Sequence, residues 1–262
     1  MKLHLLCLFI LSCLFSHAQN NEALKFDPYT SIYKKRKIGD RKHILYIGGG
    51  DYHDDLRRAA EIRKQLEIEN NYFVTYTEDY EVFADGLSKY DVLLINTTIN
   101  NLTDLQYKGI LDAVKNGMPV LGIHSATASF RSTKNGDWSE FYKMIGARFD
   151  HHPKMHKYPI KLVPNNGILD TSYANYEMFE ELYFYTHLNP ENKILLTANY
   201  QGKDSPVAWV KDYGKGKVFY TALGHSLAIS KDENFKKLIL FALEWLTDNK
   251  TNESNESKKF KL

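Results

Sequence analysis

The sequence predicts an α/β fold with a doubly wound, mostly parallel sheet and helices on both of its faces. Short, continuously apolar runs such as 91–96 are typical of parallel strands buried on both sides. Segments with helical spacing of apolar residues alternate with these runs. Neither an internal repeat nor a change of composition interrupts residues 43–247, and this length suits one large domain.

The first half of the domain provides four strands and two helices. Residues 44–47 form an apolar strand that ends in Gly48-Gly49-Gly50. A helix over 55–69 follows, with apolar residues at helical spacing and Asp54 as its N-cap. Strands are expected at 72–76, 91–96 and 118–123, and a helix that begins at Thr103 and ends before Gly117 is expected between the last two.

The second half is less regular. A short helix is expected at 138–145 and a strongly amphipathic helix at 234–247. The turn residues of 213–216 predict a hairpin between the last two strands. The predicted strands of this half are 160–163, 193–198, 207–210 and 218–221.

Both ends of the chain lie outside the predicted domain. Residues 1–18 are typical of a signal peptide: Lys2 precedes an apolar run, and Ser16-His17-Ala18 predicts cleavage after Ala18. The run is too short for a permanent membrane span, so we expect a periplasmic or secreted protein. A lipoprotein anchored at Cys13 is less favoured, because the apolar run continues past that residue. Residues 19–42 read as a polar leader and 248–262 as a disordered polar tail.

Composition excludes several classes of chemistry. Both cysteines, Cys7 and Cys13, lie in the predicted signal peptide, so the mature chain lacks disulfides, zinc–thiolate sites and thiol nucleophiles. The net charge of +2, with no basic block inside the domain, argues against a nucleic-acid partner. The 18 Tyr, 14 Phe and 3 Trp suit stacking on sugars, although most such rings belong to protein cores. The sequence leaves a homo-oligomer open.

Three histidines follow predicted strands. His124 stands at the tip of a strand-to-helix turn after Gly122, and His53 and His225 follow the first and the last strand. Ligands of open α/β sheets bind at the carboxyl ends of strands. Without cysteine, a histidine at such a turn indicates proton transfer, metal ligation or binding. The alternative for His124 is a packed histidine that bonds a backbone carbonyl.

Other residues could join these histidines. Glu181 and Tyr183 would share one face of a strand, with Glu180 pointing away, unless this segment is a solvated acidic turn. The three imidazoles with Glu181 could bind a divalent metal or act without one as acid, base and oxyanion donors. Of the pair His151-His152, one member is expected to be structural. The glycines 48–50 either cradle a phosphate or only turn the backbone.

An ordered series of motifs runs through the predicted domain. The motifs are Gly48-Gly49 with His53, residues 122–126, residues 145–149 followed by His152-Pro153, residues 180–183, residues 206–210 and residues 214–221 with Gly224-His225. This series resembles the ThuA-like (trehalose utilisation) family of the class I glutamine amidotransferase-like superfamily. The resemblance covers about residues 43–247 and implies a flavodoxin-like sheet. His124 occupies the position where amidotransferases of the superfamily carry cysteine, so amidotransferase activity is not implied.

The resemblance also implies a substrate class, the 3-keto derivatives of glycosides and disaccharides. It places His53, His124, His152, Glu181, Tyr183, Trp209 and His225 around the pocket, where Gly49 and Ser125 are also expected to contact substrate. Two departures from the family pattern stand out. Glu180-Glu181 replaces the usual Asp-Glu, and residues 165–167 stand where the family often has His-Pro, so specificity could differ.

The expected function is an exported lyase or hydrolase that cleaves or remodels 3-keto glycosides. His124 or Glu181 would be the base, His53 and His225 would stabilise charge or hold a metal, and Tyr183, Trp209 and His152 would position the sugar. The alternative is a non-catalytic carbohydrate-binding protein on the same fold. An ordinary glycoside hydrolase needs two carboxylates beside the bond, and Glu181 alone stands out.

Overall fold

The computed structural model describes residues 39–248, except 51, 54, 99, 131 and 134–138. The chain divides into two compact units, 1–40 and 41–262, and the fold below belongs to the second. The predicted signal peptide, nearly all of the leader, the tail beyond Asp248, the cap Asp54 and Trp138 lie outside the described residues. None of the described helices is long and apolar enough to cross a membrane.

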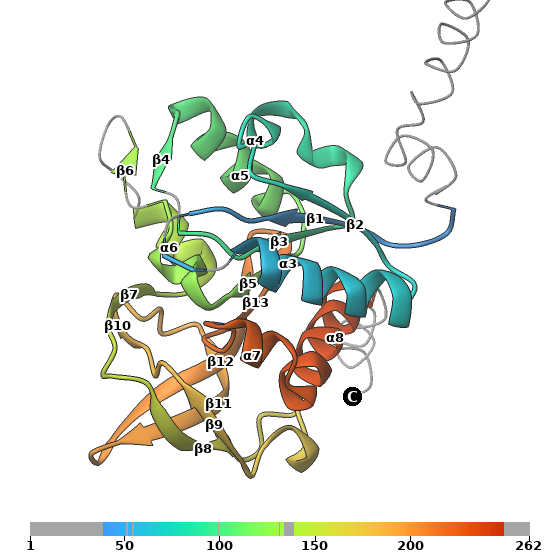
Figure 1. The fold of residues 1–262 in the computed structure, drawn as a ribbon. Helices are drawn as coiled ribbons and strands as arrows, with labels where there is room; N and C mark the ends of the chain where they lie inside the picture. Colours follow the sequence, from blue (N-terminus) through green and yellow to red (C-terminus); the bar gives the residue numbers. More distant parts are fainter. Residues whose placement is uncertain are drawn as a thin grey trace, which may run out of the picture. The chain divides into compact units, whose positions relative to one another are not determined.

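A nine-stranded sheet forms the centre of the described domain, in the order β2-β1-β3-β5-β13-β12-β11-β8-β9 (Figure 1). Its parallel part consists of β1 (His43–Ile47), β2 (Phe73–Thr77), β3 (Val92–Ile95), β5 (Val120–Ile123) and β13 (Gly216–Thr221). The order of these five strands is that of flavodoxin-like sheets. Strands β1, β3 and β5 are buried along their whole length, as their apolar sequences predict.

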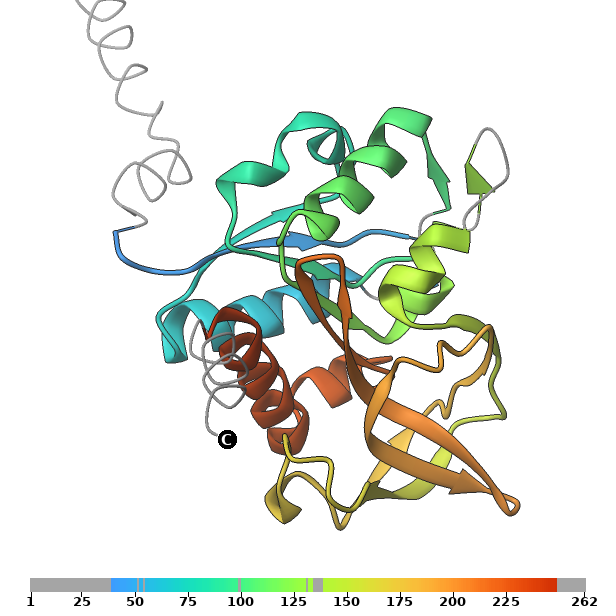
Figure 2. The same cartoon turned by 180° about the vertical axis from the view of Figure 1, so that it is seen from behind.

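Antiparallel strands extend this sheet beyond β13. They are β12 (Lys203–Tyr213), β11 (Lys193–Tyr200), β8 (His156–Leu162) and β9 (Tyr176–Glu180). The predicted turn closes the β12–β13 hairpin, in which Tyr213 pairs with Gly216. Figure 2 shows this extension leading away from the parallel strands. It matters for the site because β9 leads directly into Glu181.

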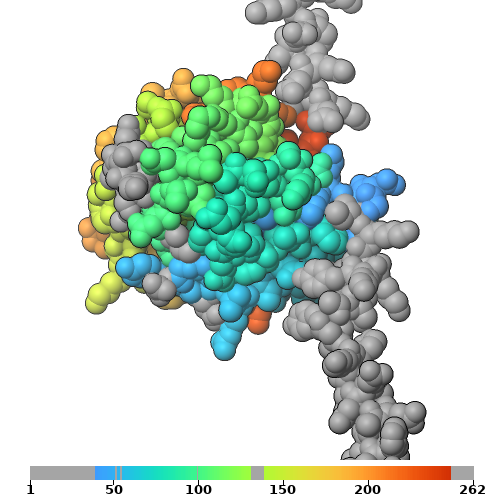
Figure 3. All heavy atoms as spheres, turned by 90° about the horizontal axis from the view of Figure 1, so that it is seen from above, coloured from blue at the N-terminus to red at the C-terminus, as the bar shows by residue number. Residues whose placement is uncertain are grey.

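Helices cover both faces of the parallel strands, as predicted. On one face, α3 (Asp55–Lys64), α7 (Leu227–Ser230) and α8 (Glu233–Thr247) pack on a core that includes Ile44 and Tyr46. On the other, α4 (Val82–Asp85), α5 (Asp104–Lys115) and α6 (Ser139–Ile145) pack on Leu45 and Ile47. Seen from above, the teal and green segments that contain α4 and α5 hide most of the strands (Figure 3). Alternate side chains of β1 thus pack in two separate hydrophobic cores, one on each face of the sheet.

Some elements differ from the sequence prediction. The helix expected at 55–69 is α-helical to Lys64 and continues as a π-helical segment, η1 (Gln65–Glu69). Several short elements were not predicted. They include α4, α7 and β9, β4 (Asn101–Leu102) paired with β6 (Ser132–Thr133), β7 (Arg148–His151) paired with β10 (Phe184–Thr186), η2 (Leu87–Lys89) and η4 (Thr171–Tyr173).

Candidate active site

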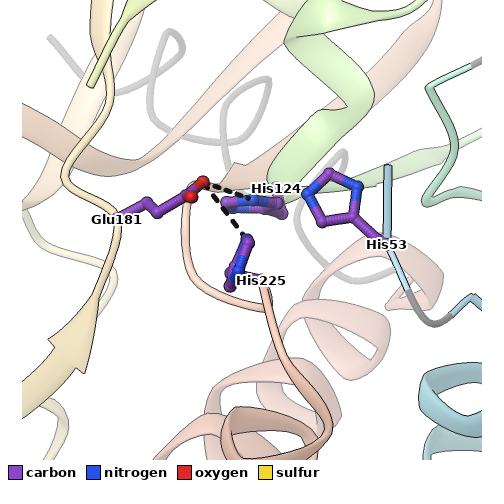
Figure 4. A group of neighbouring side chains, drawn as sticks. All are labelled: His53, His124, Glu181 and His225. Atoms are coloured by element: carbon purple, nitrogen blue, oxygen red, sulfur yellow. Dashed lines mark ion pairs between the residues drawn. The ribbon is translucent and has the colours of Figure 1, made fainter. Parts of the chain in front are cut away.

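Four predicted side chains meet at the carboxyl edge of the sheet. His53 lies between β1 and α3, His124 begins the turn η3 (His124–Ala128) after β5, and His225 follows β13. Glu181 lies between β9 and β10. Figure 4 shows these side chains pointing toward one another from separate parts of the chain. One potential ligand atom from each lies within 4.8 Å of those of the others.

The three imidazole rings form a nearly equilateral triangle. The ring centroid of His53 lies 5.1 Å from that of His124 and 5.0 Å from that of His225. The centroids of His124 and His225 are 5.3 Å apart. The ring planes are steeply inclined, at 84°, 82° and 70° in the same order. The three rings therefore pack edge to face against one another.

His124 occupies the sharp turn that the sequence predicts, and its side chain is fully buried, as in the alternative of a packed histidine. Its φ of +45° lies in the left-handed region, which is uncommon for a residue other than glycine. Nδ1 lies 2.7 Å from the carbonyl oxygen of Ala222. Because a carbonyl only accepts, this contact places the proton on Nδ1 and leaves the lone pair of a neutral ring on Nε2. The Tyr183 hydroxyl lies 2.8 Å from Nε2 and donates to it.

The Glu181 carboxylate lies among histidines. Its Oε2 is 3.2 Å from His225 Nδ1 and 3.5 Å from His124 Nε2, and its Oε1 is 3.5 Å from His152 Nε2. Burial opposes ionisation of this carboxyl, but the adjacent imidazoles of His124 and His225 outweigh burial and lower its pKa. Glu181 is therefore ionised at neutral pH.

Two histidines of the triangle titrate differently. Burial, followed by the nearby charges of His124, Arg58 and His225, lowers the pKa of His53 to about 3. Hydrogen bonding to Glu181 raises the pKa of His225, although burial opposes this shift. The site therefore combines a carboxylate with at least one imidazole that stays neutral, and such a set can bind a cation or move a proton.

A second carboxylate, Glu180, positions this site from beneath. It is fully buried. Its Oε2 accepts hydrogen bonds from the backbone N–H groups of Gly224 and His225, at 2.9 and 3.0 Å, and its Oε1 accepts from Glu181 N at 2.8 Å. Glu180 thus ties the loop of His225 to the loop of Glu181. Gly224 has a φ of +121°, which only glycine adopts without strain.

A buried ion pair supports the same loop from α3. Arg58 is fully buried, pairs with Asp55 and donates from Nη1 to the Gly224 carbonyl at 2.5 Å. These contacts place a guanidinium beneath the triangle and link the first helix to the last loop of the site.

Other predicted contact residues have different fates. Both histidines of the pair 151–152 are exposed: His152 lies near Glu181, whereas His151 pairs with Asp150. Ser125 is fully buried, and its Oγ has no hydrogen-bond partner among the described residues. Gly49 is buried, and its carbonyl accepts from Thr97 Oγ1 at 2.7 Å. Contacts of Ser125 and Gly49 with substrate stay predictions.

The expected role of Trp209 in sugar binding is wrong. Its side chain is fully buried, stacks on Tyr220 at 4.2 Å between centroids and donates from Nε1 to the Ile145 carbonyl at 2.9 Å. No surface of the ring is left for a ligand. Successive side chains along β12 point to opposite faces of the sheet, and that of Trp209 points into the core beneath α6.

Sequence reasoning also missed the positioning groups. Glu180 was expected to point away from the pocket, and Arg58 was not singled out. One signal was present: Asp55 and Arg58 share the helix face of Ala59 and Ile62, which packs on the core. Charges on an apolar face predict a buried pair. The sequence holds no comparable signal for Glu180.

One family model matches nearly the whole of the described domain. A model of the ThuA family, described as trehalose utilisation, matches residues 43–246. The chain belongs to the ThuA family. No protein with a curated description matches it.

Solved structures confirm the fold of this ThuA-family chain. A ThuA-like protein from Parabacteroides merdae is 19% identical, with a TM-score of 0.69 over 79% of this chain and 90% of its own. One from Bacteroides uniformis is 17% identical, with a TM-score of 0.64 over 82% and 96%. A β-galactosidase from Rahnella sp. R3 is 15% identical, with a TM-score of 0.55, over 80% of this chain but 31% of its own. At these identities the likeness concerns the fold alone.

Proposed function

We propose that this ThuA-family protein acts in carbohydrate catabolism by cleaving or remodelling 3-keto glycosides or disaccharides. The trehalose-utilisation family supports a sugar substrate. The observation that carries the chemistry is the convergence of Glu181 with three strand-end imidazoles in one site. The 3-keto group is the part of the proposal that rests on the family resemblance.

The proposed reaction is an elimination across C1 and C2 of the oxidised sugar. The C3 ketone acidifies the C2 proton, which a base removes. The C2–H electron pair then forms a C2=C3 bond, and negative charge moves to the C3 oxygen. When this enolate collapses, C1=C2 forms, the C1–O bond breaks and the departing oxygen takes up a proton. Such a site needs a base, an acid and an oxyanion stabiliser.

Glu181 is the base in this proposal. It is ionised, and its side chain is 12% exposed, whereas the adjacent His124 is fully buried. A carboxylate with a lowered pKa is a weak base. Strong stabilisation of the enolate oxygen must therefore accompany proton removal, and the imidazole triangle is placed to supply it. The exposed His152 would contact the sugar.

Turnover of a 3-keto glycoside tests the proposal. The purified protein is incubated with 3-keto-trehalose and with a nitrophenyl 3-keto-glucoside, and products are followed by NMR and absorbance. We expect consumption by the wild type, and a loss of about 10²- to 10⁴-fold in Glu181→Gln and His124→Gln. His151→Gln, which changes an exposed histidine outside the triangle, is the matched control. Full activity of His124→Gln, or no turnover by a folded wild type, would contradict the proposal.

A non-catalytic carbohydrate-binding protein is the second candidate, and one observation favours it. His124 is fully buried and hydrogen-bonded at both ring nitrogens, as a structural histidine would be. This candidate predicts saturable sugar binding without consumption, and binding that survives in His124→Gln. The structure does not favour an ordinary glycoside hydrolase, which needs two carboxyl groups beside the scissile bond. The second carboxylate, Glu180, is buried and accepts hydrogen bonds from three backbone N–H groups.

Export is part of the proposal as well. The features of residues 1–18 support passage through the Sec system with cleavage after Ala18. The intact mass of the protein recovered from a bacterial periplasm checks this, and Gln19 is the expected first residue. A mass that retains residues 1–18 would contradict it.

A further inference from the structure

The imidazole triangle has the shape of a metal-binding face. Nitrogens bound at about 2.0–2.1 Å to one tetrahedral ion lie about 3.3 Å from one another. The candidate donor atoms of His53, His124, His225 and Glu181 already lie within 4.8 Å of one another. These separations are close to those that one shared ion would require.

The contacts of His124 agree with this interpretation. A histidine that binds a metal usually donates its other N–H to a carbonyl or carboxylate, which fixes the tautomer. His124 has this arrangement, because Nδ1 faces the Ala222 carbonyl at 2.7 Å and Nε2 faces the other members of the cluster. A bound ion would replace the Tyr183 hydroxyl as the partner of Nε2.

His53 provides an independent observation. Its Nδ1 is buried and, among the described residues, has no hydrogen-bond partner. Buried polar nitrogens are nearly always paired, so this one indicates a missing partner at the site. The surrounding charges allow a cation: the Glu181 carboxylate borders the triangle, and the Arg58 guanidinium beneath it is paired with Asp55.

We infer that His53, His124 and His225 bind one divalent transition-metal ion. Three imidazoles suit Zn²⁺, Co²⁺ or a similar borderline ion, and three protein ligands leave a coordination position open, as in catalytic sites. The function of the ion rests on the proposed function: it would polarise the C3 ketone and stabilise the enolate oxygen. Glu181 stays beside the ion as the proton acceptor.

Metal binding is measurable without substrate. The purified full chain is stripped with a chelator and titrated with Zn²⁺ and, separately, Co²⁺ by calorimetry, and metal content is determined by mass spectrometry. We expect one ion per chain, visible absorption bands of tetrahedral Co²⁺, and a higher melting temperature in the presence of Zn²⁺. His53→Ala, His124→Ala and His225→Ala should each weaken binding at least 100-fold, whereas the control His151→Ala should not change it.

The variant Glu181→Gln distinguishes the metal ligands from the residue that accepts the proton. This variant should retain one Zn²⁺ per chain while losing turnover, and loss of the ion would overturn the assignment of Glu181 to proton transfer. A folded wild type without a stoichiometric ion overturns the metal inference, as does binding that survives all three histidine variants. If His124→Ala does not fold, the Zn²⁺ affinities of His53→Ala and His225→Ala still test the metal inference. Turnover without metal would overturn this inference alone, and a bound ion without turnover would overturn the proposed function alone.

Discussion

A single carboxylate, Glu180, decides where two of the four site residues lie. Its two oxygens accept three backbone N–H groups, from Glu181, Gly224 and His225. These peptide groups belong to loops that leave different strands of the sheet. Because hydrogen bonds to a charged acceptor are stronger and shorter than neutral ones, Glu180 fixes the distance between Glu181 and His225 without contacting any ligand itself.

Glu180→Gln tests this role. The amide keeps one acceptor oxygen but turns a donor toward at least one backbone N–H, and an unsatisfied buried N–H costs about 1–3 kcal/mol. We expect the free energy of unfolding to fall by that amount in denaturant titrations. We also expect weaker Zn²⁺ binding than in wild type, because His225 is no longer held. Glu177→Gln, on an exposed position of the same strand, is the control. Equal stability and equal binding of both variants would contradict a positioning role.

The sequence predicts the members of the site better than their environment. His53, His124 and His225 could be found because each follows a strand, and parallel strands end at one edge of the sheet. The sequence left open whether His124 is packed or accessible, since its burial depends on Tyr183 and Ala222, which come from distant segments. The prediction for Trp209 failed for a related reason: a tryptophan in a strand fits a pocket wall and a core equally well.

Helix α5 shows how close two elements can approach when a glycine lies between them. Gly109 lies in the middle of this helix, where glycine ordinarily lowers stability relative to alanine. A Cβ at this position would lie 1.9 Å from the carbonyl oxygen of Phe83, a backbone atom at α4. The glycine is therefore required by the packing of α4 on α5.

Gly109→Ala should reverse the usual effect of helix propensity. The added methyl group must push α4 away, and overpacking of this kind typically costs about 1–3 kcal/mol. Thermal and denaturant unfolding measure the change. Lys108→Ala, at the neighbouring exposed position paired with Asp112, should change stability by less than about 0.5 kcal/mol. A more stable Gly109→Ala variant would show that propensity outweighs the contact.

The elements that could be predicted are those stabilised by interactions between residues close together in the sequence. Helix α5 has a capping box, in which Thr103 and Gln106 bond each other's backbone, and its predicted bounds are nearly those observed. Strands β4, β6, β7 and β10 have two to four residues and exist because a distant segment pairs with them. Periodicity has too few residues there to produce a signal.

At the scale of the whole domain, two cores lie on opposite faces of one sheet. Trp209 is among the largest side chains of the core beneath α4, α5 and α6. It joins β12 to α6 through the Ile145 carbonyl. This core ties the antiparallel extension to the parallel strands, so its integrity affects the entire sheet.

Trp209→Phe should destabilise the protein without changing how it binds sugar. Loss of ring volume and of a buried hydrogen bond is expected to cost about 1–4 kcal/mol. Denaturant unfolding measures the loss, and sugar binding is compared at a temperature where the variant stays folded. Phe179→Leu, at a half-exposed position of β9, is expected to change stability by less than about 0.5 kcal/mol. Weaker sugar binding by a fully folded Trp209→Phe would restore a direct role for this ring.

The position of β13 in the sheet has a consequence for biogenesis. This strand is the last of the described strands along the chain, yet it lies between β5 and β12. The parallel strands and the antiparallel extension therefore remain unjoined until the C-terminal segment has been synthesised and inserted between them. A nascent or truncated chain that lacks β13 also lacks His225 and the backbone groups that Glu180 holds. Such a chain cannot assemble the site, so any activity of this protein would report that its folding is complete.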